Sequence, residues 1–123
     1  MMDLLDCVKI DTKFSMINEY WSPKIIAKID NYYIKIAKIN GEFTWHTHDD
    51  CDEVFIVHRG EMRIDFRDSC VKIPEGGLFV VEKGKEHKPA SKSECEIILF
   101  ERSDVLNTGD RKNEFTKENI EWI

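Results

Sequence analysis

The sequence is poor in proline and glycine, and it has no segment typical of a linker, a leader or a membrane anchor. Three prolines and six glycines are spread over 123 residues without forming a Pro-, Gly- or Ser-rich stretch. No apolar run approaches the roughly 18 residues of a membrane span, and Asp3 and Asp6 stand where a signal peptide would be positively charged. We therefore expect a single domain over residues 1–123, located in the cytoplasm and without a membrane partner.

Basic residues are also fewer than acidic residues. Lys and Arg number 18 against 24 Asp and Glu, which gives a formal net charge of −6. Because the chain has no dense basic run, it lacks the electrostatic footprint of a nucleic-acid-binding protein, and we expect no nucleic acid partner. Hydrophobic residues make up 41% of the chain and include three Trp and seven Phe. This content excludes disorder and predicts a buried core.

Cysteine pairs with the C-x-x-C spacing are absent, which excludes a zinc ribbon and a thioredoxin-like redox site. The four cysteines are widely spaced, at Cys7, Cys51, Cys70 and Cys95. A core of this size does not need covalent crosslinks, so we expect reduced thiols, while the even count would allow disulfides in an exported protein. Cys51 lies between two candidate metal ligands. We interpret it as an ordinary loop residue, with a pocket thiol as the alternative.

Short segments with the two-residue period of a β-strand fill the middle of the chain. The clearest is residues 61–67, where Met62, Ile64 and Phe66 alternate with charged residues. Turn residues separate the segments: Asp-Asn at 30–31 joins a predicted hairpin, and Asn-Gly at 40–41 predicts a second turn. The predicted strands are residues 24–29, 32–39, 54–57, 61–67, 70–73, 78–81 and 96–100. We expect an all-β fold, an antiparallel sandwich or barrel of roughly six to eight strands.

Helical signals occur only near the two ends of the sequence, over residues 3–18 and after Thr116. Neither segment has a complete capping box at its start. We therefore expect the β-fold to be flanked by short terminal segments that are helical or extended.

Three of the four histidines and one glutamate have a spacing that suits a metal site. His46 and His48 are two residues apart, so both imidazoles point to the same side of an extended segment. Glu53 begins a predicted strand whose inward face continues with Phe55, and burial of its carboxylate is costly without a cation. His87 follows a turn and can complete the set from a neighbouring strand. We predict His46, His48, Glu53 and His87 as the metal ligands.

Three imidazole nitrogens and one carboxylate favour a divalent first-row transition metal over Ca or Mg. We expect one such ion per chain, either Fe, Mn, Ni, Co, Cu or Zn, because the donor types do not select among these. His58 serves as a comparison: it has the strand parity opposite to Glu53, so we predict that it faces away from the site. We predict that Glu82 points to solvent, with a pocket-facing proton-transfer group as the alternative.

Residues 41–60 resemble the first cupin motif. The segment contains a glycine, an H-x-H pair, a glutamate and a closing glycine, at Gly41, His46, His48, Glu53 and Gly60. Residues 76–91 resemble the second motif through Gly76, Gly84 and His87, and the chain is similar to small bacterial cupins labelled mannose-6-phosphate isomerase-like. The resemblance implies a cupin jelly-roll β-barrel, also described as a double-stranded β-helix, with the metal inside. It also implies a homodimer.

The predicted metal site favours an enzyme that acts on a small oxygen-chelating substrate, either sugar-like or a hydroxy-carbonyl compound. Dioxygenase and isomerase are the candidate reaction classes. Glu53 is the candidate catalytic residue, because besides ligating the metal it can move a proton. Strand parity nominates five substrate-binding residues, Thr44, Phe55, Met62, Ile64 and Phe66. The alternatives are a barrel that binds or senses a small molecule without turnover and a structural cupin.

Overall fold

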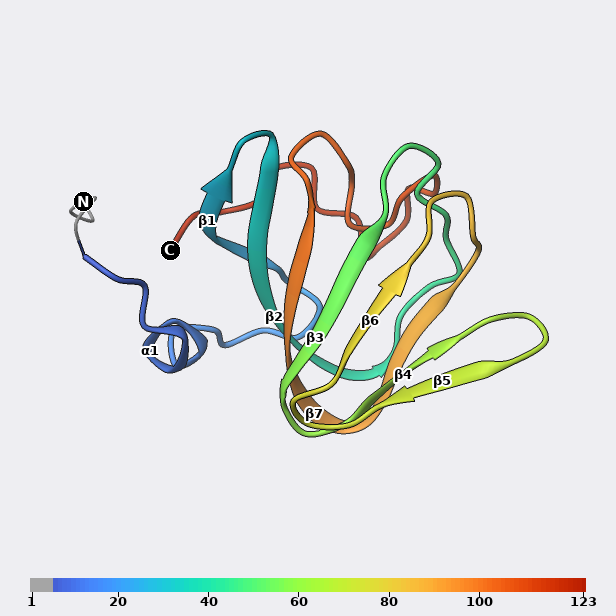
Figure 1. Ribbon diagram of the computed structural model, residues 1–123, viewed down its shortest axis with the longest axis horizontal. Helices are drawn as coiled ribbons and strands as arrows, with labels where there is room; N and C mark the ends of the chain where they lie inside the picture. Colours follow the sequence, from blue (N-terminus) through green and yellow to red (C-terminus); the bar gives the residue numbers. More distant parts are fainter. Residues whose placement is uncertain (1–5) are drawn as a thin grey trace.

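The computed structural model describes residues 6–123, which contain seven antiparallel strands and one short helix (Figure 1). The elements are α1 Ile10–Phe14, β1 Lys24–Ile29, β2 Tyr32–Glu42, β3 Glu53–Arg59, β4 Met62–Asp65, β5 Cys70–Ile73, β6 Leu78–Val81 and β7 Lys88–Arg102. The hairpin predicted for β1 and β2 is confirmed, and β1, β5 and β6 have the predicted bounds.

The strands follow the spatial order β1-β2-β7-β3-β6, and β4 pairs with both β5 and β7. Strand β7 connects the two parts of this arrangement: its first residues, Lys88 to Ala90, pair with β4, and its later residues pair with β2 and β3. The sheet curls on itself, with the β4–β5 hairpin projecting beside the lower half of β7 (Figure 1). The predicted all-β, jelly-roll barrel is therefore confirmed.

Strand β2 continues through the position of the predicted second turn. The prediction of a turn at Asn40-Gly41 is wrong, because the pairing with β7 shifts register between Ile39 and Gly41 and then resumes. Gly41 has φ +84° there, a left-handed conformation that glycine adopts at low cost in a β-bulge. The bulge bends the strand and directs the following chain toward the histidine pair.

Strand β7 is longer than the predicted segment 96–100. It begins at Lys88, and its polar residues Lys92, Ser93 and Glu94 are exposed where the strand passes between its two sets of partners. Because these residues do not alternate with apolar ones, the two-residue period is interrupted in the sequence although the strand continues in the structure.

The two ends of the chain are less helical than predicted. In the N-terminal segment only α1, Ile10–Phe14, is helical, and the predicted helical residues 3–5 lie outside the described residues. Of the two conformations expected after Thr116, helical or extended, the tail adopts no helix, and its last residues pair with β1. The Ile25 N–H donates to the Glu121 carbonyl at 2.9 Å and the Ile123 N–H donates to the Ile25 carbonyl at 3.1 Å, so backbone bonds to the edge strand replace helical ones.

Two apolar clusters hold the fold together. The larger cluster fills the barrel and includes Phe55, Met62, Ile64, Phe66 and Leu99. The smaller one lies on the outer face, where Phe14 of α1 packs with Ile17, Ile26 and Ile36. Among residues 6–123, no helix combines the length and the apolar character needed to span a bilayer.

Candidate metal centre

The four predicted ligands come from three segments that backbone hydrogen bonds hold together. His46 and His87 exchange two backbone bonds of 3.0 Å, as in an antiparallel pair, and the Gly84 N–H donates to the His48 carbonyl at 2.8 Å. Glu53 is the first residue of β3 and points to the same interior as Phe55. These contacts bring the loop after β2, the start of β3 and the loop before β7 to one end of the barrel (Figure 1).

The ligand atoms of His46, His48, Glu53 and His87 converge in a buried cluster. All of them lie within 4.8 Å of one another, and the four residues are no more than 5% exposed. The Glu53 Oε1 atom is 3.4 Å from His48 Nε2 and 3.5 Å from His87 Nε2. The structure therefore brings together the complete ligand set that the sequence predicts.

Backbone carbonyls orient two of the imidazole rings. His46 Nδ1 donates to the Thr44 carbonyl at 2.9 Å, and His87 Nδ1 donates to the Lys85 carbonyl at 2.9 Å. Because a carbonyl oxygen only accepts, each Nδ1 carries a proton, and Nε2 is the ring nitrogen that faces the cluster. This arrangement is typical of metal-ligating histidines, whose second nitrogen is fixed by a hydrogen bond.

The cluster contains buried polar atoms without hydrogen-bond partners among residues 6–123. They include both ring nitrogens of His48, Glu53 Oε1 and His87 Nε2. Such atoms are rare in folded proteins because each loses its bonds to water without replacement. A divalent cation coordinated by these atoms would satisfy them, and their nitrogen and oxygen donors suit a first-row transition metal. The group is therefore able to hold a metal.

Electrostatic interactions divide the histidines into two kinds. Burial and the neighbouring His87 lower the pKa of His46 to about 4. Burial also acts to lower the pKa of His48, but the Glu53 carboxylate and Glu101 outweigh it and raise that pKa to about 9. Burial opposes ionisation of Glu53, yet the positive charge of the neighbouring His48 holds the pKa of Glu53 well below the usual range. Without a metal, the centre thus contains an ion pair between His48 and Glu53.

A second buried carboxylate, Glu101 on β7, lies beside this centre and is not among the predicted residues. Its Oε1 accepts a bond of 2.9 Å from Lys35 Nζ on β2, and its Oε2 is 3.9 Å from His48 Nε2. Burial and the charge of Glu53 raise the pKa of Glu101 to about 8. A dication at Glu53 would oppose the second cause, because it offsets that negative charge. Lys35 has the inward strand parity of Ala37 and Ile39, and this parity is the signal in the sequence that could have identified Lys35 as a buried residue.

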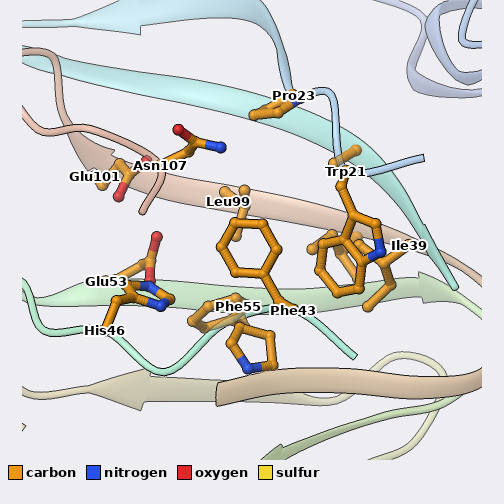
Figure 2. A pocket seen from close by; sticks show the side chains of 13 residues that line it. Trp21, Pro23, Ile39, Phe43, His46, Glu53, Phe55, Leu99, Glu101 and Asn107 are labelled. Carbon is orange, nitrogen blue, oxygen red and sulfur yellow. The ribbon is translucent and has the colours of Figure 1, made fainter. Parts of the chain in front are cut away.

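A cavity of about 40 Å³ adjoins the cluster. Figure 2 shows polar groups from His46, Glu53, Glu101 and Asn107 at one end and mainly apolar side chains at the other. The apolar part includes Trp21, Ile39, Phe43, Phe55 and Leu99. Its aromatic wall is ordered by stacking: the Trp21 and Phe43 rings are 4.7 Å apart and nearly parallel.

Of the five residues that parity nominates for substrate binding, Phe55 lines this cavity. Met62, Ile64 and Phe66 are buried in the barrel core but are not part of the cavity wall. Thr44 is outside the wall as well; its carbonyl orients His46, and its hydroxyl accepts a bond of 3.2 Å from Asn113. Trp21, Phe43 and Asn107 line the cavity and were not nominated, because they lie in irregular segments where strand parity does not apply.

Three residues that flank the centre have other roles. Glu82 is exposed, as predicted. Cys51 is buried: its thiol donates to the Asp52 carbonyl at 2.9 Å and contacts the Arg102 N–H, and burial raises its pKa. All four cysteines, which belong to the described part of the chain, are free thiols as expected. His58 faces the outer side, as predicted, where it bonds Asp11 at 2.6 Å and stacks on Phe14.

Asp11 and His58, together with Glu96, form a second group of potential ligands on that outer face. Arg59 contacts both carboxylates, at 3.2 Å from Asp11 and 3.5 Å from Glu96. The guanidinium offsets one of the two negative charges, and we interpret the group as an ion-pair network that attaches α1 to the sheet.

The segment after β7 clamps the histidine pair from the side. Thr47 lies between the two histidines, and its N–H donates to Asp110 Oδ1 at 2.9 Å while its carbonyl accepts from the Asp110 N–H at 2.9 Å. Gly109, at φ +60°, packs so closely that a Cβ there would overlap the Thr47 carbonyl and lie 3.1 Å from the His46 ring. Only glycine fits this approach without displacing the histidine segment.

Comparison with known proteins agrees with this geometry. The model of the cupin domain family Cupin_2 matches residues 33–101, which contain all four predicted ligands. A crystal structure of a cupin-2 domain containing protein from Shewanella frigidimarina is 45% identical, with a TM-score of 0.76, and covers 77% of this chain and 93% of its own.

Two curated relatives match over part of their length. The uncharacterized protein YdbB of Bacillus subtilis is 34% identical over 54% of this chain and 59% of its own. A Saccharolobus solfataricus protein described as "Putative dioxygenase SSO1533" is 25% identical over 70% of this chain but only 23% of its own length. This chain thus spans less than two thirds of either relative. The match of the family model to more than half of the chain, together with the shared barrel, establishes that the chain belongs to the cupin domain family.

Proposed function

We propose that the protein is a metal-dependent enzyme that acts on a small substrate chelating the metal through oxygen atoms, such as a sugar-like or hydroxy-carbonyl compound. The ligands are His46, His48, Glu53 and His87, and they hold one divalent ion of Fe, Mn, Ni, Co, Cu or Zn. The observation that carries the proposal is the convergence of four buried donor groups, several of them without any other partner. When bound, such an ion supplies Lewis acidity toward a coordinated oxygen and, if it is redox-active, a site for O₂.

The residues around the donor group give this proposal its chemical content. The carbonyls of Thr44 and Lys85 fix the two rings that face each other, so the donor geometry is set before the metal arrives. Glu53 lies between the ligand cluster and the cavity wall, and we assign it the transfer of a substrate proton. The apolar wall excludes water from the far side of the cavity, which strengthens electrostatic interactions at the polar end.

Dioxygenation is the reaction class with an independent point of support. The match to the Saccharolobus protein covers 70% of this chain. A donor set of three histidines and one carboxylate suits iron among the first-row transition metals, so iron is the metal with which we would test O₂ chemistry first. Isomerisation has no corresponding observation and is the other outcome of the activity screen.

The first experiment is to measure the metal content of untagged protein by mass spectrometry, beside the double variant His48→Ala, Glu53→Ala. We expect close to one transition metal ion per chain in the wild type and none in the variant. His58→Ala is the matched control, because it removes a histidine on the opposite face of the same sheet and should leave the metal in place.

Iron-loaded protein is then screened for O₂ uptake with enediols and hydroxy-ketones, and for isomerised products without O₂. Turnover that depends on His48 and Glu53 supports the proposal. If the metal-loaded protein binds a small molecule tightly but forms no product, this would instead indicate a binding or sensing barrel. Absence of metal after reconstitution, with the fold intact, would contradict the proposal and indicate a structural cupin.

We also propose that the partner of the chain is a second copy of itself, paired through β6. This strand is at one edge of the sheet, and its Leu78 and Val80 are 59% and 42% exposed. An apolar edge strand with free backbone groups favours sheet extension. Sedimentation equilibrium should give a dimer, and Leu78→Lys should shift it toward monomer, whereas Met16→Lys, which alters an equally exposed apolar side chain elsewhere, should not. A monomeric wild type would contradict this assignment.

The free cysteine thiols are relevant to the cellular compartment in which the protein works. Four reduced cysteines, two of them exposed at Cys7 and Cys70, are compatible with a reducing environment, and we propose that the protein works in the cytoplasm. Fractionation of cells that express the full-length chain would test this assignment, and recovery from an oxidising compartment would contradict it.

A further inference from the structure

Glu101 and Lys35 form a buried ion pair that the metal ligand set does not require. Each residue is 1% exposed, and the Nζ to Oε1 distance is 2.9 Å. Removing two charges from water has a desolvation cost that their attraction only partly returns, and apolar residues of similar size often serve stability equally well. The pair therefore has no evident role in stability, and its position beside the ligand cluster points to a role in binding.

Only one oxygen of Glu101 is used by Lys35. The other, Oε2, is buried and has no hydrogen-bond partner among residues 6–123, and it lies 3.9 Å from His48 Nε2. Lys35 thus fixes the carboxylate in one orientation and leaves an acceptor free at the polar end of the cavity. In Figure 2 the carboxylates of Glu101 and Glu53 face each other across this end. A free acceptor oxygen in such a place is satisfied when a ligand brings a donor to it.

The other side chains that line the cavity indicate the chemical character of the ligand body. Among the described residues that line the cavity there is no Lys or Arg, and Lys35 is already bonded to Glu101. A phosphate or carboxylate group on the body of a ligand would find no cation there, and its burial would be costly. The wall formed by Trp21, Phe43 and Phe55 instead offers apolar and aromatic contacts.

We infer that Glu101 is a specificity-determining residue of the proposed metal site, with Lys35 as its positioning residue. In this inference, which rests on the proposed function, Glu101 Oε2 accepts a hydrogen bond from a hydroxyl group adjacent to an oxygen that binds the metal. The ligand class is an ortho-dihydroxy or hydroxy-carbonyl compound with an apolar, preferably planar body. Sugar phosphates and ligands with an anionic body are excluded from this class.

The charge balance of the site agrees with this class. Lys35 offsets Glu101, so that a bound dication and Glu53 together leave about one net positive charge. A ligand that has lost one proton and kept one hydroxyl matches both this charge and the free acceptor. The cavity itself has room for only a few water molecules. A ring-sized body therefore requires the side chains of the apolar wall to rearrange around it.

The test uses the full chain loaded with Co²⁺ under argon, because the visible absorption of cobalt reports both metal binding and ligand exchange without turnover. The probes are 4-methylcatechol and its monomethyl ether, 2-methoxy-4-methylphenol, which has the same ring but lacks the second hydroxyl. We expect the wild type to bind the catechol at least about tenfold more tightly, the usual effect of one hydrogen bond to a charged group. A third probe, 3,4-dihydroxybenzoate, should bind at least about tenfold more weakly than 4-methylcatechol, because its carboxylate has no cation in the cavity.

The variant that tests the residue is the double substitution Lys35→Met, Glu101→Leu, which replaces the ion pair with apolar groups of similar size. Its Co²⁺ affinity should stay within about threefold of the wild type, while its preference for the catechol over the ether should fall about tenfold, by the share that the hydrogen bond to Glu101 contributes; the share due to chelation should remain. Glu101→Gln keeps the shape of the side chain and should reduce the preference to an intermediate value, because a neutral amide is a weaker acceptor. It also serves as the test if the double variant does not fold.

The outcomes separate this inference from the proposed function. Wild-type protein that fails to bind Co²⁺ contradicts the proposed function, and the inference falls with it. Cobalt binding without preference for 4-methylcatechol, or with equal affinity for 3,4-dihydroxybenzoate, overturns the inference alone. An unchanged preference in the variants also overturns it, as does loss of Co²⁺ from the variants, since Glu101 would then act on the metal rather than on its ligand.

Discussion

His48 is the residue at which proton binding and metal binding compete. Its ring lies next to Glu53, and in the metal-free protein it keeps its proton up to a pKa of about 9. A raised pKa in the folded state means that the protonated ring stabilises the metal-free fold below the ordinary value of about 6.5, and that this stabilisation is lost as the pH rises toward 9. A metal can bind His48 only after the proton has left.

The first prediction concerns the pH dependence of metal affinity. Because one proton leaves His48 for each ion bound, the affinity for Zn²⁺ should rise about tenfold per pH unit between pH 6 and 8 from this residue alone. Isothermal titration at several pH values, in buffers of different ionisation enthalpy, measures both the affinity and the protons released. His46, with a pKa of about 4, contributes nothing in this range. Metal affinity that does not change with pH would contradict the ion pair between His48 and Glu53.

At the same scale, most of the site follows from strand parity. His46 and His48 point one way because they are two residues apart, and Glu53 and His58 point to opposite faces because five residues separate them. Glu101 and Lys35 need more than parity. Their pairing depends on the register between β2 and β7, in which Lys35 lies opposite Leu99 and Glu101 lies two residue pairs further along, on the same face. Register between strands so distant in the chain is not contained in either strand alone.

At the scale of elements, the loop that follows β7 and the loop that contains the histidines act as one unit. Gly109 packs against the Thr47 carbonyl and the His46 ring, and Asp110 bonds the Thr47 backbone on both sides. No local pattern in the sequence indicates this contact, because residues 47 and 110 meet only after the barrel has formed.

The second prediction is that Gly109→Ala lowers metal affinity by roughly 10–100-fold, as expected for a change just behind a ligand. Gly76→Ala is the matched control: Gly76 also has a positive φ, of +80°, but a Cβ there meets nothing within 4 Å. Both variants should lose about 1–2 kcal/mol of stability from backbone strain; Gly109→Ala should lose more because its Cβ overlaps the Thr47 carbonyl, and only this variant should lose metal affinity. Equal metal affinities of the two variants, measured by competition with a chelator, would show that the clamp does not position His46.

Helix α1 is too short to be stable alone, and Phe14 is its fully buried contact with the sheet. Phe14 is 1% exposed, stacks on His58 at 5.1 Å and packs in the outer cluster. Length explains why the sequence overstates this helix: isolated helices of fewer than roughly 12 residues are marginal in water, so tertiary packing decides where α1 begins and ends.

The third prediction is that Phe14→Ala destabilises the protein by about 3 kcal/mol, through lost burial and the cavity left behind. Met16→Ala in the same segment should cost less than about 0.5 kcal/mol, because this side chain is 55% exposed. Urea unfolding followed by tryptophan fluorescence gives both values. Metal affinity should be unchanged in both variants, since α1 lies on the outer face, and a loss of metal from Phe14→Ala would contradict that separation of the two faces.

For the whole molecule, the sequence predicts the fold class better than the extent of its parts. Turn residues and strand periods give seven strand positions, because each inward face must be apolar. The bend of β7 and the bulge in β2 depend instead on closure of the barrel, which requires long strands to cross between its two halves. The position of the site depends on this closure. Its ligands come from two loops and the start of β3 at one end of the barrel, and backbone hydrogen bonds join the two loops.

Metal binding should therefore stabilise the molecule as a whole. A ligand present at a hundredfold its dissociation constant stabilises the folded state by about 2.7 kcal/mol, which for a chain of 123 residues corresponds to a rise of roughly 10 °C in melting temperature. Differential scanning calorimetry of protein with Zn²⁺ and with a chelator measures this difference. The double variant His48→Ala, Glu53→Ala should melt at the same temperature under both conditions, because its remaining two histidines bind the ion too weakly. If wild type and variant responded equally to Zn²⁺, the stabilising ion would be bound outside the His46, His48, Glu53 and His87 cluster. The buried unpaired atoms would then need another explanation.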